Sequence, residues 1–479
     1  MPSVNKTSMR EELDSLKSQF DELLVGGKVS TESQVLFRAL LGLIEIMFAV
    51  FMEKTTRKTK DNSSIPSSQT GVDETTPPKK GSKGKGPSQN DETSSNTRTV
   101  EVTEVLEVNE CEHCGEDLSQ AECEAKERRT LIDIIFEKRE EHKDAEIKFC
   151  QRCKKRTKAK FPSSHQGPIQ YGPGIKAYML NLLVAQMVAL GRIQKMVKTL
   201  IGVVISEASI LKYVLQLHMA LEEWESSAIE QLMDMPTLHV DETSMRIDKK
   251  NHWVHVCSGG DITLKWVHPK RGKEAIDDID VIPRYGGILI HDGWKSYELY
   301  GNCRHGLCGS HILRELKFIV DSNGYRWATN IKELLQETCH KVSMRDEKKL
   351  TEEEYANLQK RYRNLLTRGE KELPPIPEKQ SGKRGRVAKS DAHNLWERLK
   401  KHESAVLLFA CETHVPFTNN RAERDLRMGK VKQKVSGCFR VEKYAKAYCR
   451  ISSYLQTMSA KGYNPLVAVQ MALAGKVPQ

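Results

Sequence analysis

An acidic side chain among arginines near the C-terminal end is the first candidate for chemistry. Glu423 follows the loop-like residues 416–420 and lies among Arg421, Arg424 and Arg427. Residues three apart share a helix face, so the three arginines would line one stripe with Glu423 at its margin. The pattern fits a phosphate site with one metal ligand, or a solvated, ion-paired helix start. Partners for Glu423 elsewhere in the chain would favour the first interpretation.

Two aspartates occupy strand-like segments in the middle of the chain. Asp241 lies within one apolar segment, and Asp292 directly follows another. The predicted strands are 238–243, 252–258, 263–268 and 287–291, with a hairpin turn at 258–261 and a helix over 273–279. In that order the first and fourth strands can be neighbours, which would bring the two aspartates together. Buried carboxylates are costly unless they are paired or bind a metal.

Asp241, Asp292 and Glu423 together have the composition of a two-metal site. Carboxylates suit Mg²⁺, and two such ions about 4 Å apart support in-line displacement at phosphorus. Taken singly, each aspartate could instead cap a strand end. The strand order matches the opening of a ribonuclease-H-like α/β domain, although other α/β folds share this spacing.

Four cysteines in two Cys-x-x-Cys pairs predict a structural zinc site: Cys111, Cys114, Cys150 and Cys153. Strand-like residues 130–135 and 145–149 lie between the pairs, as in a zinc ribbon, although the gap of about 35 residues exceeds the usual template. We take His113 and Cys123 as non-ligands. Free thiols are the alternative. Without a recognisable secretion signal, twelve cysteines favour metal ligation or free thiols over disulfides.

The elements that must position these residues predict a multidomain chain, mostly α plus α/β. The expected regions are a helical, leucine-zipper-like element for oligomerisation or DNA binding (1–54), a disordered linker (55–99), the zinc ribbon (100–165), a helical segment (166–235), a ribonuclease-H-like catalytic domain (236–440) and a C-terminal helical segment (441–479). A helical insertion over about 325–405 interrupts the catalytic domain. The 166–235 segment, with a break at Gly202, is compatible with a helix-turn-helix or with a brace for the next domain.

Charge and hydropathy restrict the partners. A net charge of +11 and a pI near 8.9 favour a polyanion. Residues 35–52 are the most membrane-like stretch, but Arg38 and Glu45 interrupt it, so we expect a buried or self-association helix and no membrane contact. The basic runs 79–85 and 382–386 are candidate phosphate contacts, with solvated loops as the alternative.

Three motifs resemble those of insertion-sequence 66 family transposases, which are bacterial enzymes of the DDE class. The motifs are His-Val-Asp-Glu-Thr at 239–243, His-Asp-Gly-Trp-Lys-Ser-Tyr at 291–297, and residues 419–427. The resemblance extends to the zinc ribbon, the helical segment, the N-terminal element and Cys308-Gly-Ser-His311, so it covers most of the chain. Trp294 and Lys295 depart from the more usual residues of the middle motif.

The resemblance implies a DNA transposase that cuts element ends and joins the 3′-hydroxyl ends to target DNA by two-metal phosphoryl transfer. The family's acids correspond to Asp241, Asp292 and Glu423, which would bind Mg²⁺ or Mn²⁺, and Zn²⁺ would occupy the ribbon. His311 is a candidate helper, or else a structural histidine. The residues expected to grip DNA are Arg421, Arg424, Arg427, Lys430, Lys432 and Lys434.

The expected partners are double-stranded DNA of the element ends and the target, further copies of the chain, and small accessory proteins of the same element. The expected location is the cytoplasm, with nucleoid association when active. Two other functions stay open: a catalytically silent, transposase-derived DNA-binding protein, and a ribonuclease-H-like nuclease that does not join strands. A nicking assay separates the first from a transposase, and strand-transfer products separate the second.

Overall fold

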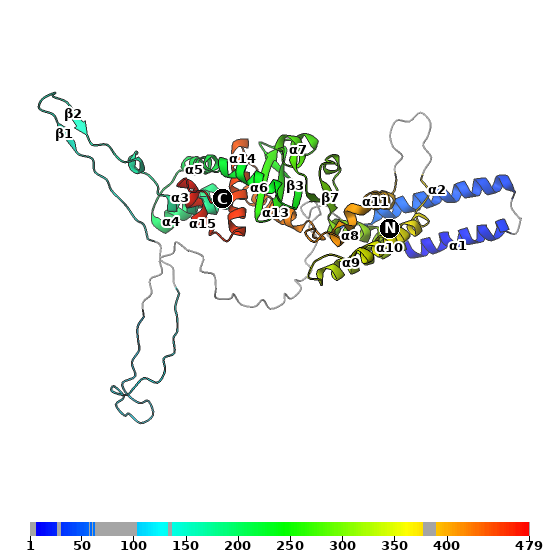
Figure 1. The fold of residues 1–479 in the computed structure, drawn as a ribbon, viewed down its shortest axis with the longest axis horizontal. Coiled ribbons are helices and arrows are strands. Elements are labelled where there is room, and N and C mark those ends of the chain that lie inside the picture. The colour runs from blue at the N-terminus through cyan, green and yellow to red at the C-terminus, as the bar shows by residue number, and fades with distance from the viewer. Residues whose placement is uncertain are drawn as a thin grey trace. The chain divides into compact units, whose positions relative to one another are not determined.

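The computed structural model describes residues 6–25, 30–56, 58–59, 61–62, 103–132, 137–376 and 389–478. They form two compact units, one from residues 1–87 and 227–430 and the other from 88–226 and 431–479 (Figure 1). The division falls within helices α6 (Glu222–Met233) and α13 (Asn420–Ser436). Most of the predicted linker 55–99 and the basic runs 79–85 and 382–386 lie outside the described residues.

A five-stranded mixed sheet organises the first unit. Its strands are β3 (Thr237–Ile247), β4 (Lys250–Gly259), β5 (Ile262–His268), β6 (Ile288–His291) and β7 (Arg304–Leu307). Their spatial order is β5-β4-β3-β6-β7, in which β3, β4 and β5 run antiparallel while β6 and β7 run parallel to β3. The predicted neighbourhood of the first and fourth strands is therefore confirmed. Strand β7 was not predicted.

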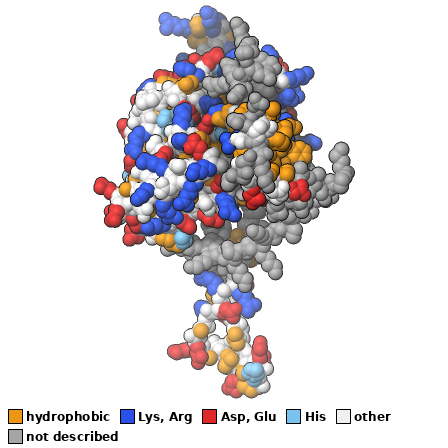
Figure 2. Space-filling model, turned by 90° about the vertical axis from the view of Figure 1, so that its right-hand side faces the viewer, with side chains coloured by type: hydrophobic (Ala, Val, Ile, Leu, Met, Phe, Trp, Pro, Cys, Tyr) orange, Lys and Arg blue, Asp and Glu red, His pale blue; other side chains and the backbone are white. Residues whose placement is uncertain are grey.

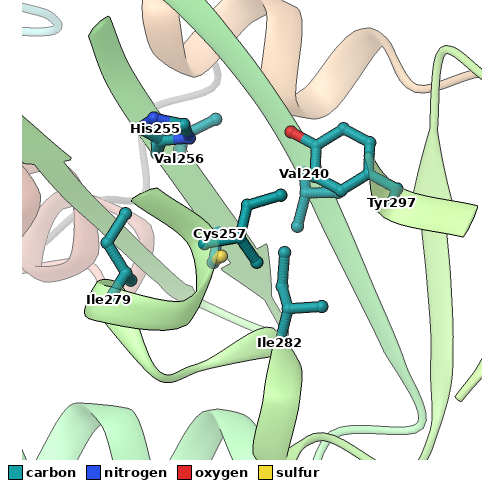
Figure 3. Close-up of a pocket in the computed structure, with 8 residues that line it drawn as sticks. Val240, His255, Val256, Cys257, Ile279, Ile282 and Tyr297 are labelled. Atoms are coloured by element: carbon teal, nitrogen blue, oxygen red, sulfur yellow. The ribbon is translucent and has the colours of Figure 1, made fainter. Parts of the chain in front are cut away.

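Strand β3 sends alternate side chains to opposite faces of the sheet. Val240 and its β4 partner Cys257 line a small apolar cavity together with Ile276 of α7 (Lys273–Ile279), so this face lies against α7 (Figure 3). By alternation, Asp241 lies on the other face with His239, which contacts the residue preceding α13. The two central acidic positions of β3, Asp241 and Glu242, therefore face opposite ways.

Helices that follow β7 build an apolar core of their own. They are α8 (Gly309–Asn323), α9 (Arg326–Ser343), α10 (Glu352–Glu370), α11 (Asp391–Lys401) and α12 (Glu403–Leu407). Their buried side chains include Trp327 and Tyr362, and the indole N–H of Trp396 donates to the carbonyl of Leu366 at 2.8 Å. Helical structure thus begins at Gly309, earlier than the predicted boundary near residue 325.

The chain leaves the sheet for these helices and returns to it at the same place. The N–H of Gly309 donates to the carbonyl of Phe417 at 2.8 Å, and the N–H of Asn419 points at Cys308 Sγ at 3.1 Å. A Cβ atom at position 309 would lie 2.3 Å from the Phe417 ring, so only glycine permits this approach. The entry and the exit of the helical segment are thereby joined.

Two N-terminal helices form a hairpin, α1 (Lys6–Val25) and α2 (Thr31–Thr55). The Phe20 and Phe37 rings lie 5.5 Å apart across it. The C-terminal end of α2 docks through Glu53, whose carboxylate accepts the N–H groups of Asp391 and Ala392 at 2.8 and 3.1 Å. Glu53 therefore caps α11 and ties the hairpin to the unit. The segment Ser33–Thr55 is long and apolar enough, by length and composition, to cross a membrane.

The described helices of the second unit are α3 (Pro173–Val184), α4 (Leu190–Ile201), α5 (Glu207–Ala220), α14 (Glu442–Ala460) and α15 (Pro465–Leu473). The predicted break is present, because Gly202 ends α4 with φ of +69° and Ser206 caps α5 by accepting the N–H of Ser209. The unit also has a small hairpin of β1 (Ile147–Phe149) and β2 (Arg156–Lys158). The predicted strand at 145–149 corresponds to β1, whereas residues 130–132 form no strand and 133–136 lie outside the described residues.

Candidate active site

Asp241 and Asp292 lie where β3 and β6 run side by side. Parallel pairing places His239 opposite Ile290, and continuing this register by two residues places Asp241 opposite Asp292. Neighbouring strands are about 4.8 Å apart, so the two carboxylates belong to one cluster. Strand β6 ends at His291, which leaves Asp292 at the start of a loop. The two predicted aspartates are thus brought together by strand order and register.

Burial and repulsion between neighbouring carboxylates shift the pKa of Asp241 in this cluster. Burial is the main cause that raises the pKa of Asp241 well above its usual range, and the charges of Glu242, Asp292 and Glu423 raise it further. Opposing them, Asp241 Oδ1 accepts the N–H of Glu242 at 2.8 Å. Asp292 Oδ1 likewise accepts the N–H of Trp294 at 2.9 Å. Crowded carboxylates of this kind are stabilised by a bound cation.

Asn419 docks the beginning of α13 on the central strand. Its Nδ2 donates to the carbonyl of Val240 at 2.8 Å, and its Oδ1 lies 2.9 Å from Nδ1 of His239. The side chain is buried, with 1% exposed. Glu423 lies one turn into the helix, where its N–H bonds to the Asn419 carbonyl at 3.4 Å. Asn419 thereby connects the strand of Asp241 to the helix of Glu423.

A second contact fixes the same helix over the sheet. Buried Asp425 accepts hydrogen bonds from Ser258 Oγ at 2.7 Å and from Thr263 Oγ1 at 3.1 Å. Arg421 Nη2 donates to the carbonyl of Ile262 at 3.0 Å. These bonds reach β4 and β5, so α13 is held against three strands. The position of Glu423 is therefore set by its neighbours on the helix.

Glu423 also has close neighbours at the beginning of α8. Ligand atoms of Cys308, His311 and Glu423 all lie within 4.8 Å of one another, and within the described residues this is the group that meets that distance. The carboxylates of Asp241, Asp292 and Glu423 are less tightly gathered. His311 Nδ1 lies 3.5 Å from Glu423 Oε1, and both atoms are buried without a hydrogen-bond partner in the described part of the chain.

The electrostatics of His311 follow from this setting. Burial lowers its pKa, but the contact with Cys308 and the Glu423 charge outweigh that effect, and the net pKa is raised. The unpartnered Oε1 of Glu423 is the kind of buried oxygen that a cation satisfies. Oxygen ligands from Asp241, Asp292 and Glu423 fit Mg²⁺ or Mn²⁺, whereas a sulfur, nitrogen and oxygen set from Cys308, His311 and Glu423 suits a softer metal such as Zn²⁺.

The six basic residues predicted to grip DNA are not equivalent in the structure. Arg424, Arg427 and Lys434 are exposed. Arg421 contacts β5, and Lys430 Nζ donates to Ser244 at 2.8 and 3.0 Å. Lys432 is buried, with its Nζ over the rings of Phe439 and Tyr448. We therefore retain the prediction of DNA contacts for Arg424, Arg427 and Lys434. The side chains of Arg421, Lys430 and Lys432 contact other parts of the protein.

The predicted zinc ligands form two separate turns. The Cys111 N–H bonds to the Glu116 carbonyl and the Cys150 N–H to the Lys155 carbonyl, each at 2.9 Å. Backbone N–H groups inside each turn lower the pKa of Cys111 and of Cys150, which favours thiolates. The four cysteines are not among the described groups whose ligand atoms lie within 4.8 Å of one another. Zinc binding by all four stays a prediction.

Sequence reasoning missed several residues around the acids. Asn419, Trp294, Glu242 and Tyr297 stood within the motifs without a role, and Arg271 was not considered. Glu242 is almost fully buried beside Asp241, where Arg271 and the hydroxyl of Tyr297 both bond to it. The adjacent acids at 241 and 242 were the signal that could have prompted a search for a cation partner.

The fold and the site therefore describe an α/β unit in which acidic residues come from the central strand, from the loop after its parallel neighbour and from a helix that also carries exposed basic residues. The chain belongs to the Transposase IS66 family, whose family model matches residues 168–447. None of the curated proteins matches the chain. The matched range includes Asp241, Asp292, His311 and Glu423, and it confirms the resemblance seen in the motifs. Family membership supports a transposase role and implies DNA binding.

Proposed function

We propose that this chain is an insertion-sequence transposase that cuts element ends and joins their 3′-hydroxyl groups to target DNA at a two-metal centre. Asp241, Asp292 and Glu423 would hold Mg²⁺ or Mn²⁺. The observation that carries the proposal is the register of β3 and β6, which, continued by two residues, places Asp241 opposite Asp292, with Glu423 close enough to raise the pKa of Asp241.

The sheet supports a ribonuclease-H-like catalytic domain. Numbered within the domain, its strands lie in the order 3-2-1-4-5, with an antiparallel meander followed by two parallel strands. The acids come from the central strand, the end of the fourth strand and a helix after the fifth. This strand order supports the proposal that three carboxylates far apart in sequence act at one site.

The bound ions would activate water, and later the 3′-hydroxyl, and would stabilise the leaving oxygen. The chain's own residues orient the ligands. The N–H of Glu242 fixes one oxygen of Asp241 and the N–H of Trp294 fixes one oxygen of Asp292, so the second oxygen of each carboxylate would be the metal ligand. His311, beside Glu423, is suited to orient that carboxylate. Such fixed geometry is the main contribution a protein makes to phosphoryl transfer.

Exposed arginines on α13 support DNA binding close to these acids. Arg424 and Arg427 are one turn apart and exposed, and both follow Glu423 on the same helix. Guanidinium groups bind phosphate oxygens through paired hydrogen bonds. The same helix would therefore supply a metal ligand and contacts to the strand that carries the scissile phosphate.

The α1–α2 hairpin supports self-association, in which a second copy would be the partner. Large apolar side chains of α2 are exposed, namely Val35, Leu36, Phe37, Leu40, Leu43, Ile44, Met47 and Phe51. In Figure 2, hydrophobic side chains gather on the end of the unit that carries these helices. Exposed patches of this kind mark protein interfaces. The ion pair between Lys17 and Glu45 and the docking of Glu53 favour a partner helix over a bilayer.

The location and the remaining partners follow from this function. We expect the protein in the bacterial cytoplasm, associated with the nucleoid when active. Small accessory proteins of the same element would be further partners. No contact with a membrane is expected.

The decisive experiment is cleavage and joining of DNA that carries the element's inverted repeats. Asp241→Asn, Asp292→Asn and Glu423→Gln should each reduce Mg²⁺-dependent cleavage by at least about a hundredfold while DNA binding persists. Asp248→Asn is the matched control, because Asp248 lies on the exposed turn of the same β3–β4 hairpin with φ of +45°, a conformation that asparagine tolerates. Normal cleavage by the Asp241 variant would refute the assignment.

The same assay separates the two rival functions. A silent DNA-binding protein would shift the DNA but leave every strand intact with the unaltered chain. A nuclease would cut without producing strand-transfer products. The intact set of three acids favours the transposase.

A further inference from the structure

Three flat side chains form a stack beside the Glu242 carboxylate, which we call the indole–guanidinium stack: Trp253, Arg271 and Trp294. The guanidinium carbon of Arg271 lies 4.8 Å from the ring centre of Trp253 and 4.3 Å from that of Trp294. The three residues come from β4, from the segment after β5 and from the loop after β6. Each is only partly buried, and 39% of the Arg271 side chain is exposed.

Hydrogen bonds to Glu242 hold the stack in place. Arg271 donates through Nε and Nη2 to Glu242 Oε1 at 2.7 and 2.6 Å. The buried hydroxyl of Tyr297 donates to Glu242 Oε2, and its ring meets that of Trp294 edge-on, with centroids 5.7 Å apart. Side chains that are already ordered lose little entropy when a ligand binds.

The stack is also joined to both catalytic aspartates. The N–H of Glu242 bonds to Asp241, and the N–H of Trp294 bonds to Asp292. Strand β6 pairs with β3 only as far as His239, whereas β3 continues to Ile247. Trp253 is the β4 partner of Ser244, which shares a face of β3 with Glu242, so the stack lies on the face opposite Asp241. It is joined to the two aspartates through the backbone of Glu242 and Trp294.

A purely structural role accounts for only part of this arrangement. Neutralising a buried Glu242 requires Arg271, but it does not require two half-exposed indoles on either side of the guanidinium. Within the described residues, the third nitrogen of Arg271, Nη1, forms no hydrogen bond. A partly exposed aromatic surface beside a guanidinium is suited to stacking a nucleobase and contacting its phosphate.

We infer that the indole–guanidinium stack binds an unpaired nucleotide of the DNA strand next to the scissile phosphate. The inference rests on the proposed function. A base can lie on the stack, across β3 from Asp241, only if it leaves its complement while its strand stays at the acids. Extruding a nucleotide costs its base stacking, and an indole face restores that interaction. The predicted ligand is thus a single unpaired nucleotide, with its base on an indole and its phosphate at Nη1 of Arg271.

The test compares intact DNA with DNA that lacks one base. Abasic sites are placed in turn at each of the positions within about three nucleotides of the cleavage site, a span that the reach of one stacking platform sets. Trp294→Ala should cut intact DNA about tenfold more slowly, consistent with the loss of one base stack. At one abasic position the variant and the unaltered protein should cut at equal rates, because no base is left to stack.

Controls separate this inference from the proposed function and from misfolding. Trp266→Ala removes an indole from the neighbouring strand β5, outside the stack, and should show no dependence on the abasic position. Trp294→Phe and Trp253→Phe keep a smaller aromatic ring at each position. They should slow the cleavage of intact DNA less than Trp294→Ala does, and the slowing should again disappear at the same abasic position. Equal slowing of these variants on intact and abasic DNA at every position would overturn the stack. Absence of cleavage by the unaltered protein would instead overturn the proposed function.

Discussion

The side-chain amide of Asn419 donates a 2.8 Å hydrogen bond to the carbonyl of Val240. Val240 immediately precedes Asp241, and Asn419 immediately precedes the helix that carries Glu423. One buried amide therefore sets the separation of two acids that lie far apart in the chain. Its oxygen simultaneously contacts His239, on the other side of Val240.

Replacing this amide should disrupt the site more than the fold. Asn419→Ala leaves the Val240 carbonyl and His239 without a buried partner, which should lower the free energy of unfolding by about 1–3 kcal/mol. Cleavage should fall at least about tenfold even where the variant is fully folded, because Glu423 loses its position. Urea unfolding and the cleavage assay measure the two effects. Asn420→Ala, at the exposed next position, is the control, and unchanged cleavage by Asn419→Ala would contradict this role.

Burial of two histidines should lower the free energy of unfolding in mild acid. Burial lowers the pKa of His291 to about 3 and that of His255 to about 4. The unfolded chain binds protons at these residues below about pH 6.5, and the folded chain does not until pH 3 to 4. The free energy of unfolding should therefore decrease as pH falls through that window, by about 1.4 kcal/mol per pH unit for each histidine.

Urea unfolding between pH 7.5 and 5 measures this effect. His291→Gln removes one titrating group and should flatten the dependence of stability on pH. His414→Gln is a control at an exposed histidine and should leave it unchanged. An equal slope in the His291 variant and the unaltered protein would exclude His291 as a cause.

The arginines of α13 should have two different roles, one in DNA binding and one in stabilising the fold. Arg424→Ala and Arg427→Ala should weaken DNA binding and reduce the slope of log affinity against log salt by about one for each phosphate that the variant no longer binds. Arg421→Ala should instead destabilise the fold, since Arg421 bonds to Ile262 and lies 4.0 Å from Asp425. Fluorescence anisotropy at several salt concentrations, with thermal unfolding in parallel, distinguishes these outcomes. A salt slope that is unchanged in the Arg424 and Arg427 variants would remove them from the DNA interface.

The cysteine turns should bind zinc when the four thiolates come together. Protein purified without chelator should contain about one zinc ion per chain, bound through four sulfurs. Serine substitution of Cys111 or Cys150 should release it, whereas Cys123→Ser should retain it. Metal analysis by mass spectrometry provides the measurement. Absence of zinc from the unaltered protein, or retention of zinc by the Cys111 variant, would argue against a zinc ribbon.

Negative charges introduced on the exposed face of α2 should dissociate the oligomer into single chains. Leu36 and Leu40 are 72% and 52% exposed, and Leu36→Asp with Leu40→Asp would place two carboxylates on this apolar surface. The protein should shift from an oligomer to a monomer, as measured by light scattering after size exclusion. Ser18→Asp adds one carboxylate at an exposed position of α1 and should leave the oligomer intact. A monomeric unaltered protein would exclude this interface.

Apolar patterning was enough to predict the four strands 238–243, 252–258, 263–268 and 287–291, and the neighbourhood of β3 and β6. The pairing of Asp241 with Asp292 followed from that order, because a strand fixes which residues lie opposite each other. Strand β7 could not be predicted, because Arg304-His-Gly-Leu307 is short, polar and contains glycine. Edge strands of this kind owe their structure to the neighbouring strand and little to their own sequence.

Contacts between distant segments were invisible in the sequence. Nothing local distinguishes Lys432, which is buried, from Lys434, which is exposed on the same helix. The pairing of Glu242 with Arg271 joins separate segments, and only the fold shows that two tryptophans enclose it. Helix periodicity identifies a basic stripe, but the packing of that helix decides which cations reach solvent.

The hydrogen bond between Gly309 and Phe417 has an evolutionary consequence. Because the helical segment leaves and re-enters the sheet at one point, the length of the part beyond α8 does not set the spacing of the acids. The entropy cost of a longer excursion grows only slowly with its length once the ends are fixed. Insertions or deletions in this segment beyond α8 should therefore alter its outer surface, and with it the partners it can contact, without moving the acids.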